Sequence, residues 1–395
     1  MRVLLISPVA ALDPPCGDIT YTETLLKYSP AGVEYETYGA AIQRGALVER
    51  ARRSRLWNEP VLTLIAKTVN VARQKRWMFW EPFRFFDIRP GEYDLIHAHV
   101  FSTAFRVRDC PLIISCGAPQ RDLYLNYRTH SRQRVNWMER AERGLGRLMG
   151  VNCTSYRMPQ AERIMVYTEY FRDYLQAGGY MPADRIDVIP IMHQCDAPPI
   201  TPRKPTRIGF VANDFNAKGG QVLLKAFERV RATVPHAELQ VVGSVPLLSA
   251  DECAAKGIVW VSRVPREKLL SEYMPSFDVF AYPTPHDCFS YVMLEAMASG
   301  AAIATSDYVS MPEAVDFGKA GLISPVGDFE ALARNIIKLM DSETNYRFRC
   351  AARKRFEEHF SCTAVAPRML KAYEDSMASY REPVHNDRRT PVSSV

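Results

Sequence analysis

The 395-residue sequence lacks the features that mark several protein classes. Its nine cysteines are an odd number, form no C-x-x-C pair and cluster with no histidines. This argues against a disulfide framework and against a structural zinc site. No apolar run approaches the roughly 18 residues that a transmembrane helix needs. We therefore expect a protein of a reducing cytoplasm, with no segment that spans a membrane.

What is present is typical of a soluble globular protein. Hydrophobic residues make up 47% of the chain and charged residues 24%, and the length allows two domains that each bury a core. The first apolar run, with its β-branched residues, fits a buried strand better than a signal peptide. The Pro-rich stretch APPITPRKPT predicts a linker. We place an N-terminal domain at 1–198, the linker at 199–206, a C-terminal domain at 207–364, a helix at 365–381 and a mobile tail at 382–395.

The formal net charge of +6 is concentrated in one segment. Residues 44–89 hold eleven Lys and Arg against four Asp and Glu, a net charge of +7, interleaved with seven Trp and Phe. This pattern suits an interfacial helix on an anionic bilayer. A helix packed on a sheet with a basic outer face, the commoner outcome in general, would give the same pattern. No RNA- or DNA-binding motif accompanies it, so we expect no nucleic-acid partner.

Residues 280–300, FAYPTPHDCFSYVMLEAMASG, carry the most informative pattern. A short apolar strand is broken by two prolines, and a helix follows from Tyr291 until Gly300 ends it. Asp287 lies in the loop and Glu295 lies inside the helix, so both can face a ligand held over the helix N-terminus. Unpaired backbone donors at such an end suit a phosphate, and here they belong to Phe289, Ser290, Tyr291 and Val292. The pattern indicates a nucleotide-sugar site, although a solvated helix residue and a turn former would give the same spacing.

A second strand, loop and helix begins at residue 207 with RIGFVAND, FNAKGG and QVLLKAFERV. Gly219 lets the backbone approach a ligand, and Lys218 can neutralise a diphosphate. An isolated lysine before two glycines is usually a surface residue, but the strand, loop and helix context favours a functional role.

The N-terminal half offers two weaker candidates. Gly17 lies in the loop after the first strand, where open α/β sheets bind ligands, and a plain turn is the alternative. His99 lies at the end of the strand in YDLIHAHV, where it can bind or shuttle a proton. The alternative is that one of the two histidines only forms a hydrogen bond in the core. Two histidines with no third ligand do not make a metal site.

These segments resemble retaining glycosyltransferases of the GT-B architecture, above all their family 4. Residues 280–300 resemble the acidic E-x7-E signature, with Asp287 in place of the first Glu, and LEAMASGAAIATSD and MPEAVDFGKAGLISPVGDFEALA match its continuation. The resemblance covers the C-terminal half well and the N-terminal half loosely. It implies an α/β fold with two Rossmann-like doubly wound domains facing across a cleft. The implied reaction transfers a sugar from a UDP- or GDP-linked donor to a glycan or lipid-linked acceptor hydroxyl, with retention.

The resemblance also implies residue roles. Lys218 and the helix amides would stabilise the leaving diphosphate, Asp287 would hold sugar hydroxyls, and Glu295 would hold the ribose. Gly17 would approach the donor phosphates, and the loop containing Val264 would hold the base. No D-x-D motif is present, which fits a site that needs no metal or other cofactor.

Two departures from the family pattern support a rival interpretation. Cys116 and Gly117 stand where relatives carry a histidine, and Asn213 stands where they carry an arginine, so one cation is missing. The chain could therefore be a non-catalytic scaffold or a nucleotide-sugar-binding protein, or a hydrolase or epimerase on the same fold. The joint presence of Lys218, Asp287 and Glu295 favours the transferase. If residues 44–89 dock on a bilayer, the protein would be peripheral at the inner face of the membrane.

Overall fold

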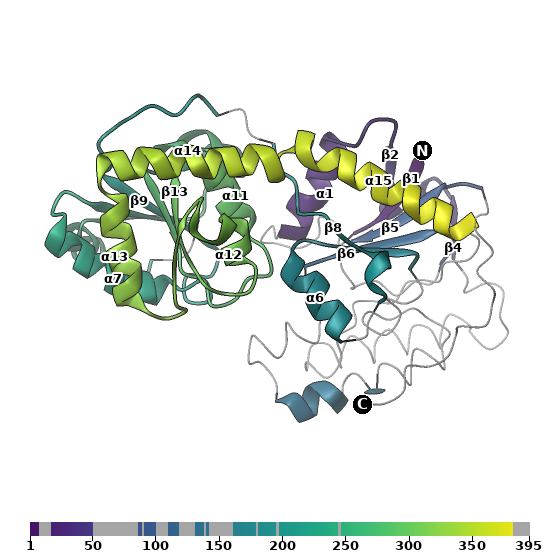
Figure 1. Cartoon of the computed structure of the whole chain (residues 1–395), viewed down its shortest axis with the longest axis horizontal. Coiled ribbons are helices and arrows are strands. Elements are labelled where there is room, and N and C mark those ends of the chain that lie inside the picture. Colours follow the sequence, from purple (N-terminus) through teal and green to yellow (C-terminus); the bar gives the residue numbers. More distant parts are fainter. Residues whose placement is uncertain are drawn as a thin grey trace. The chain divides into compact units, whose positions relative to one another are not determined.

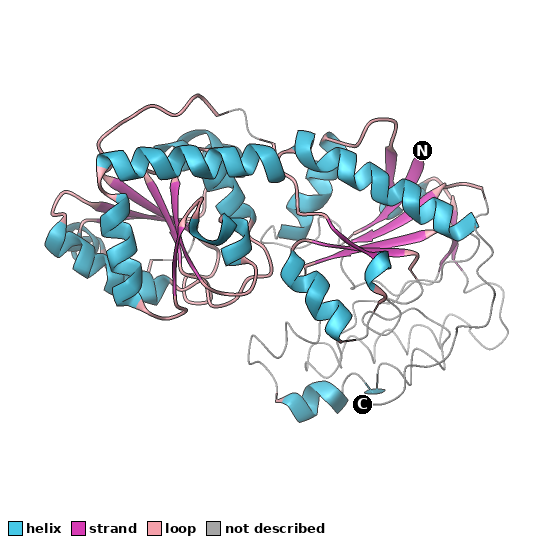
Figure 2. Ribbon diagram, in the orientation of Figure 1, coloured by secondary structure: helices cyan, strands magenta, loops and turns pink. Residues whose placement is uncertain are grey.

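The computed structural model divides the chain into two compact units, drawn in Figures 1 and 2. Unit 1 comprises Met1–Ile189 together with Ala366–Val395, and unit 2 comprises Pro190–Val365. Each unit is built on a parallel six-stranded sheet with flanking helices. The structure describes residues 1–7, 17–49, 86–88, 91–99, 110–117, 131–137, 140–141, 161–178, 181–194, 197–243 and 246–381.

The sheet of unit 1 has the strand order β2-β1-β5-β6-β7-β8. The four central strands are mostly buried, because helices cover a parallel sheet on both faces, whereas the two edge strands, β2 and β8, are partly exposed. The strands are β1 (Arg2–Ile6), β2 (Glu34–Thr37), β5 (Leu95–His99), β6 (Leu112–Cys116), β7 (Arg163–Val166) and β8 (Ile186–Val188). The other elements are α1 (Gly17–Lys27), α2 (Tyr38–Gln43), α6 (Glu169–Ala177), η3 (Ala183–Arg185) and an antiparallel pair, β3 (Leu47–Glu49) and β4 (Phe86–Ile88).

The sheet of unit 2 has the order β11-β10-β9-β12-β13-β14. Its strands are β9 (Arg207–Val211), β10 (Glu238–Val242), β11 (Ile258–Val261), β12 (Val279–Tyr282), β13 (Ala302–Ser306) and β14 (Leu322–Ser324). Its helices are α7 (Gly220–Thr233), α8 (Ala250–Lys256), α9 (Arg266–Lys268), η4 (Leu269–Tyr273), α10 (Met274–Ser276), α11 (Tyr291–Ala298), α12 (Met311–Ala314), η5 (Asp316–Gly318), α13 (Phe329–Leu339) and α14 (Ser342–His359).

The last helix, α15 (Cys362–Arg381), begins in unit 2, and its residues from Ala366 onward group with unit 1. Tyr373 of this helix is fully buried, and its hydroxyl lies 2.7 Å from the hydroxyl of Tyr35 on β2. The sequence placed a helix at 365–381 and expected it to cross back to the N-terminal domain. Residues 382–395, predicted to be a tail, lie outside the described residues.

The division between the units falls at Pro190, whereas the sequence placed the linker at 199–206. The Pro-rich segment is anchored within unit 2 by arginines. Arg349 donates to the Thr201 carbonyl at 3.0 Å, and Arg203 forms an ion pair with the buried Asp278. Proline has no N–H, but the carbonyls of such a segment remain good acceptors for guanidinium groups. The composition of the segment indicated an extended conformation, but it could not show which residues hold the segment in place.

The prediction of two Rossmann-like α/β units is confirmed by these sheets. Within the described residues, no helix is long and apolar enough to cross a membrane. Of the basic segment 44–89, only 44–49 and 86–88 are described. The remainder of the segment lies outside the described residues, so its helix and its membrane contact stay predictions.

Candidate functional site

The carboxyl ends of β9 and β12 meet at the centre of the unit 2 sheet. These two strands pair in parallel although they are not consecutive. Between them the chain forms β10 and β11, which lie toward one edge of the sheet. Ligands of open α/β sheets bind where the strand order reverses in this way. The loop after β9 carries Lys218, and the loop after β12 carries Asp287. The topology therefore brings together two candidates that are far apart in the sequence.

Lys218 and Asp287 form an ion pair, with Nζ 2.8 Å from Oδ2. Nζ also donates to the carbonyl of His286 at 2.8 Å, and the Tyr282 hydroxyl donates to the same Asp287 Oδ2 at 2.7 Å. The Lys218 side chain is 24% exposed and that of Asp287 15%. Two of the three ammonium hydrogens are thus engaged. Asp287 Oδ1 has no hydrogen-bond partner among the described residues.

Gly219 allows the two loops to come this close. Its φ is +83°, and a Cβ at this position would lie 2.1 Å from the carbonyl oxygen of Pro283. Only glycine combines this backbone angle with that contact. The sequence predicted that Gly219 would let the backbone approach a ligand. What its backbone approaches in the structure is the loop that carries Asp287.

The N-terminus of α11 follows the same loop. Ser290 is its N-cap, and the Ser290 hydroxyl accepts from the amide of Met293 at 3.3 Å. Tyr291 and Val292, in the first turn, are partly exposed, and Phe289 contacts the ring of Phe360 edge to face. The N-terminus of a helix carries a partial positive charge that suits a phosphate.

Glu295 is placed differently from the expectation that it faces a ligand openly. Its side chain is fully buried, and Oε1 lies 2.6 Å from Nη2 of Arg266 on α9. Its other oxygen, Oε2, is buried with no hydrogen-bond partner among the described residues. Burial lowers the pKa of the neighbouring His193, and the Glu295 charge partly opposes that shift. Sequence reasoning missed Arg266, because a lone arginine after Pro265 carries no signal of its partner.

In unit 1, both histidines of the H-x-H pattern are buried on one side of β5. His99 Nδ1 lies 2.8 Å from Ser115 Oγ, and its ring stacks on Tyr21 with centroids 3.8 Å apart. His97 joins the same Ser115 Oγ at 2.7 Å through Nε2, and the Tyr373 hydroxyl at 2.7 Å through Nδ1. Both histidines thus form hydrogen bonds within unit 1, and the role of His99 at the site stays a prediction. The alternation of the strand indicated their common side, but not Ser115 or Tyr373.

The remaining candidates lie at or after the ends of strands in the two sheets. Gly17 is the first residue of α1, Asn213 is exposed just after β9, and Val264 is partly exposed after β11. Cys116, at the end of β6, is buried, and burial raises its thiol pKa. Gly17 and His99 belong to unit 1, and the other predicted site residues belong to unit 2.

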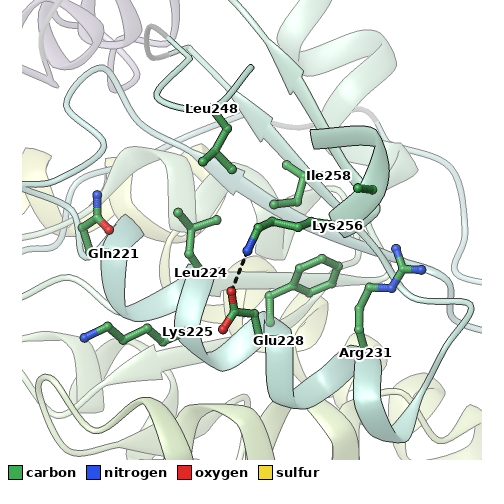
Figure 3. Close-up of a pocket in the computed structure, with 10 residues that line it drawn as sticks. Gln221, Leu224, Lys225, Glu228, Arg231, Leu248, Lys256 and Ile258 are labelled. Atoms are coloured by element: carbon green, nitrogen blue, oxygen red, sulfur yellow. Dashed lines mark hydrogen bonds and ion pairs between the residues drawn. The ribbon is translucent and has the colours of Figure 1, made fainter. Parts of the chain in front are cut away.

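A cavity of about 390 Å³ lies elsewhere in unit 2, between α7 and α8 (Figure 3). Lys256 and Glu228 form a 2.7 Å ion pair at this cavity, and Arg231 lies at one end of it. None of the predicted site residues lines it. It is therefore separate from the Lys218 and Asp287 pair.

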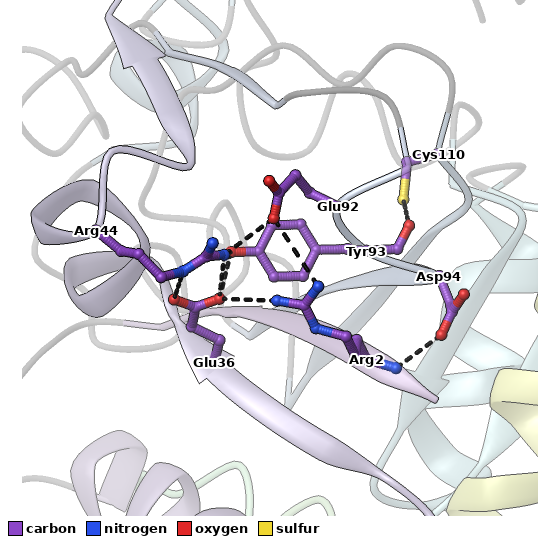
Figure 4. Close-up of polar contacts among 7 residues, drawn as sticks. All are labelled: Arg2, Glu36, Arg44, Glu92, Tyr93, Asp94 and Cys110. Carbon is purple, nitrogen blue, oxygen red and sulfur yellow. Dashed lines mark hydrogen bonds and ion pairs between the residues drawn. The ribbon is translucent and has the colours of Figure 1, made fainter.

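A charge cluster in unit 1 joins residues of β1 and β2, the end of α2 and the segment before β5 (Figure 4). Arg44 bonds to Glu36 at 2.9 Å and to Glu92 at 3.0 Å, and Arg2 lies near both carboxylates. The guanidinium of Arg44 holds the pKa of Glu36 below its usual value. Arg44, the first residue of the basic segment, is thus engaged within the unit.

Comparison with known proteins matches residues 205–342 to the family described as Glycosyl transferases group 1. The MMP alpha-(1->4)-mannosyltransferase of Mycolicibacterium hassiacum is 32% identical over 180 residues, which cover 43% of this chain and 43% of that protein. The chain spans less than half the length of this mannosyltransferase. The same holds for two other glycosyltransferases that it matches.

Solved structures extend the likeness over nearly the whole chain. The sucrose-phosphate synthase of Thermosynechococcus elongatus has a TM-score of 0.63 at 17% identity, covering 96% of this chain and 99% of that one. HepE of Anabaena, in complex with UDP-glucose, has a TM-score of 0.59 at 14% identity, covering 95% and 99%. At such identities the likeness concerns the fold, and it confirms the predicted two-domain GT-B architecture.

Proposed function

We propose that this chain, which has the GT-B fold, transfers a glycosyl group from a nucleoside diphosphate sugar to an acceptor hydroxyl and retains the anomeric configuration. The observation that carries the proposal is the Lys218 and Asp287 pair beside the N-terminus of α11. Lys218 keeps one ammonium hydrogen, and Asp287 keeps one carboxylate oxygen, beyond the bonds they make. A glycosyl diphosphate offers a phosphate oxygen and sugar hydroxyls, which match one donor and one acceptor.

In this mechanism the chain's own groups meet the charge of the leaving diphosphate. Lys218 and the first amides of α11 hold its oxygens, and such donors act most strongly where charge develops in the transition state. Gly219 keeps Lys218 in place, and Asn213 adds a hydrogen bond without a charge. No divalent metal is required. The departing phosphate oxygen takes the proton of the acceptor hydroxyl as the new glycosidic bond forms on the same face.

The remaining site residues have supporting roles. Asp287 holds a hydroxyl of the transferred sugar, Glu295 holds the ribose, and the segment around Val264 holds the base through its backbone. In unit 1, His99 offers an imidazole at the carboxyl end of β5, and Gly17 begins the helix after β1. Because the Glu295 carboxylate is buried against Arg266, the ribose has to approach it beside the guanidinium.

The relatives support the choice of donor and acceptor. HepE was solved with UDP-glucose, and the mycobacterial relative is a mannosyltransferase. We therefore propose a UDP- or GDP-linked donor and a glycan or lipid-linked acceptor. We further propose that the protein works in the cytoplasm, where the basic segment 44–89 would bring it to the inner face of an anionic membrane.

The test is a thermal-shift screen of the full chain with UDP, GDP, UDP-glucose and GDP-mannose. A ligand at 100 times its dissociation constant stabilises the folded state by about 2.7 kcal/mol. Lys218→Met should abolish the shift, whereas Lys225→Met, which removes an exposed lysine of α7, should leave it unchanged. A wild type that responds to none of the four compounds would refute the proposal.

Turnover separates the transferase from the rival function. The departures at Cys116, Gly117 and Asn213 favour a non-catalytic nucleotide-sugar-binding protein. Such a protein would bind a nucleotide sugar and leave it intact in the presence of glycan and lipid-linked acceptors. Release of UDP or GDP that depends on an acceptor supports the transferase, and release that needs no acceptor would indicate a hydrolase.

A further inference from the structure

Tyr282 is the last residue of β12, and its hydroxyl reaches the carboxylate of Asp287. The residue is only 2% exposed. Its ring stacks on Phe280, with centroids 5.9 Å apart, and lies 6.4 Å from the ring of Phe210. A ring held in this way has little freedom, so the position of its hydroxyl is fixed by the core of unit 2.

The two donors to Asp287 converge on a single oxygen. The Tyr282 hydroxyl donates at 2.7 Å and Lys218 Nζ at 2.8 Å, both to Oδ2. A carboxylate can accept bonds on both oxygens, yet Oδ1 has no hydrogen-bond partner among the described residues. Since the Asp287 side chain retains 15% exposure, the pair of donors fixes the plane of the carboxylate and leaves one oxygen for a ligand.

We propose that Tyr282 is a positioning residue that acts with Lys218 to orient Asp287, so that Oδ1 accepts one hydroxyl of the sugar being transferred. This inference rests on the proposed function and deepens it, because it names a determinant of sugar recognition. Tyr282 itself touches neither the sugar nor the diphosphate. The Tyr282 hydroxyl therefore affects the binding only of ligands that carry a sugar beyond the second phosphate.

The short side chain of Asp287 explains why a second donor matters here. Lys218 is long and flexible, so it fixes the distance to the carboxylate better than its orientation. The tyrosine hydroxyl adds a rigid second point. A glutamate would be one methylene longer, and it would carry its carboxylate past the Tyr282 hydroxyl toward the ligand.

The first experiment compares wild type with Tyr282→Phe, a change that removes one oxygen atom and keeps the ring. Calorimetric titrations would use UDP against UDP-glucose, and GDP against GDP-mannose. Hydrogen bonds to charged groups are strong, so we expect about tenfold weaker binding of the recognised nucleotide sugar. Binding of the matching nucleoside diphosphate should be unchanged. Tyr346→Phe, on the exposed face of α14, is the matched control and should alter neither affinity.

The second experiment changes the length of the carboxylate with Tyr282 intact. Asp287→Glu should also weaken the nucleotide sugar about tenfold and leave the diphosphate unaffected. In the Tyr282→Phe background, Asp287→Glu should weaken binding of the nucleotide sugar little further, because the hydroxyl that the longer side chain would otherwise have to pass is absent.

The outcomes separate this inference from the function on which it rests. If wild type binds none of the four compounds, the proposed function fails and the inference fails with it. If wild type binds a nucleotide sugar but Tyr282→Phe binds it equally well, only the inference is overturned. Equal weakening of the diphosphate and the nucleotide sugar would show a general structural role, which also overturns it.

Discussion

Replacing Gly219 with alanine tests whether the contact between the two site loops is as close as the structure shows. The glycine has a φ of +83°, and a left-handed backbone angle costs an alanine roughly 1–2 kcal/mol. The new Cβ would also lie 2.1 Å from the Pro283 carbonyl oxygen, against the 3.4 Å at which ordinary contact begins. The neighbouring atom is backbone, so it cannot rotate away.

The two loops would have to separate by more than 1 Å, and overpacking of this kind costs roughly 1–3 kcal/mol. The expected loss of stability is therefore about 2–5 kcal/mol in unit 2. Each 1 kcal/mol lowers the unfolding temperature of a domain of this size by about 2–4 °C. Since Lys218 is adjacent, binding of UDP-glucose or GDP-mannose should fall as well.

The matched control is Gly327→Ala. Gly327 has the same φ of +83°, but a Cβ there would have no atom within 4 Å. It should therefore cost only the conformational part, roughly 1–2 kcal/mol. Scanning calorimetry and a nucleotide-sugar titration would be run on both variants. If Gly219→Ala destabilises the protein no more than Gly327→Ala, the close approach of the two loops is refuted.

Four further predictions follow from the charges and their burial. Arg266→Met should destabilise unit 2 by about 2 kcal/mol. The loss is smaller than for a fully buried pair, because the arginine side chain is more than a third exposed. Glu295→Leu in the same chain should restore most of the lost stability, and additive losses in urea unfolding would contradict this expectation. Transfer should survive EDTA, because Lys218 and the α11 amides meet the phosphate charge, and a strict requirement for magnesium or manganese would overturn that mechanism. Burial holds the pKa of His97 well below 6.5. The contribution of the neutral imidazole to stability is therefore complete above about pH 6.5 and declines at lower pH, by at most about 1.4 kcal/mol per pH unit. Melting curves from pH 8 to pH 5 should show this decline, and His97→Asn should make the curve flatter. Finally, wild type should co-sediment with anionic liposomes at low salt and less at high salt. A variant in which four arginines of the segment 44–89 are changed to serine should not co-sediment (Arg50, Arg52, Arg53 and Arg55). Equal sedimentation of both proteins would show that the segment is a solvated face.

The sequence by itself determined the strand, loop and helix from 279 to 300. The apolar run, the two prolines and Gly300 are local signals, and each acts within a few residues of its own position. The same holds for the loop around Lys218, where a glycine pair opens a helix after a buried strand. Local pattern therefore sufficed for the α/β fold class and for the principal donor-site candidates.

Only the tertiary structure decided what these residues contact. Lys218 meets Asp287 because β9 and β12 are neighbours in a sheet whose order reverses between them. Arg266 of α9 meets Glu295 of α11, whose carboxylate is fully buried although spacing alone presented it as open to a ligand.

The same physical reason applies to the groups that the sequence did not reveal. Tyr282 has the pattern of a core residue, and nothing near it in the chain shows that its hydroxyl reaches Asp287. Tyr373 is far from His97 in the sequence, yet their polar atoms lie 2.7 Å apart. Hydrogen bonds act over about 3 Å and depend on direction, whereas periodicity specifies only the face on which a side chain lies. The partners of a polar residue are therefore set by the packing of whole elements.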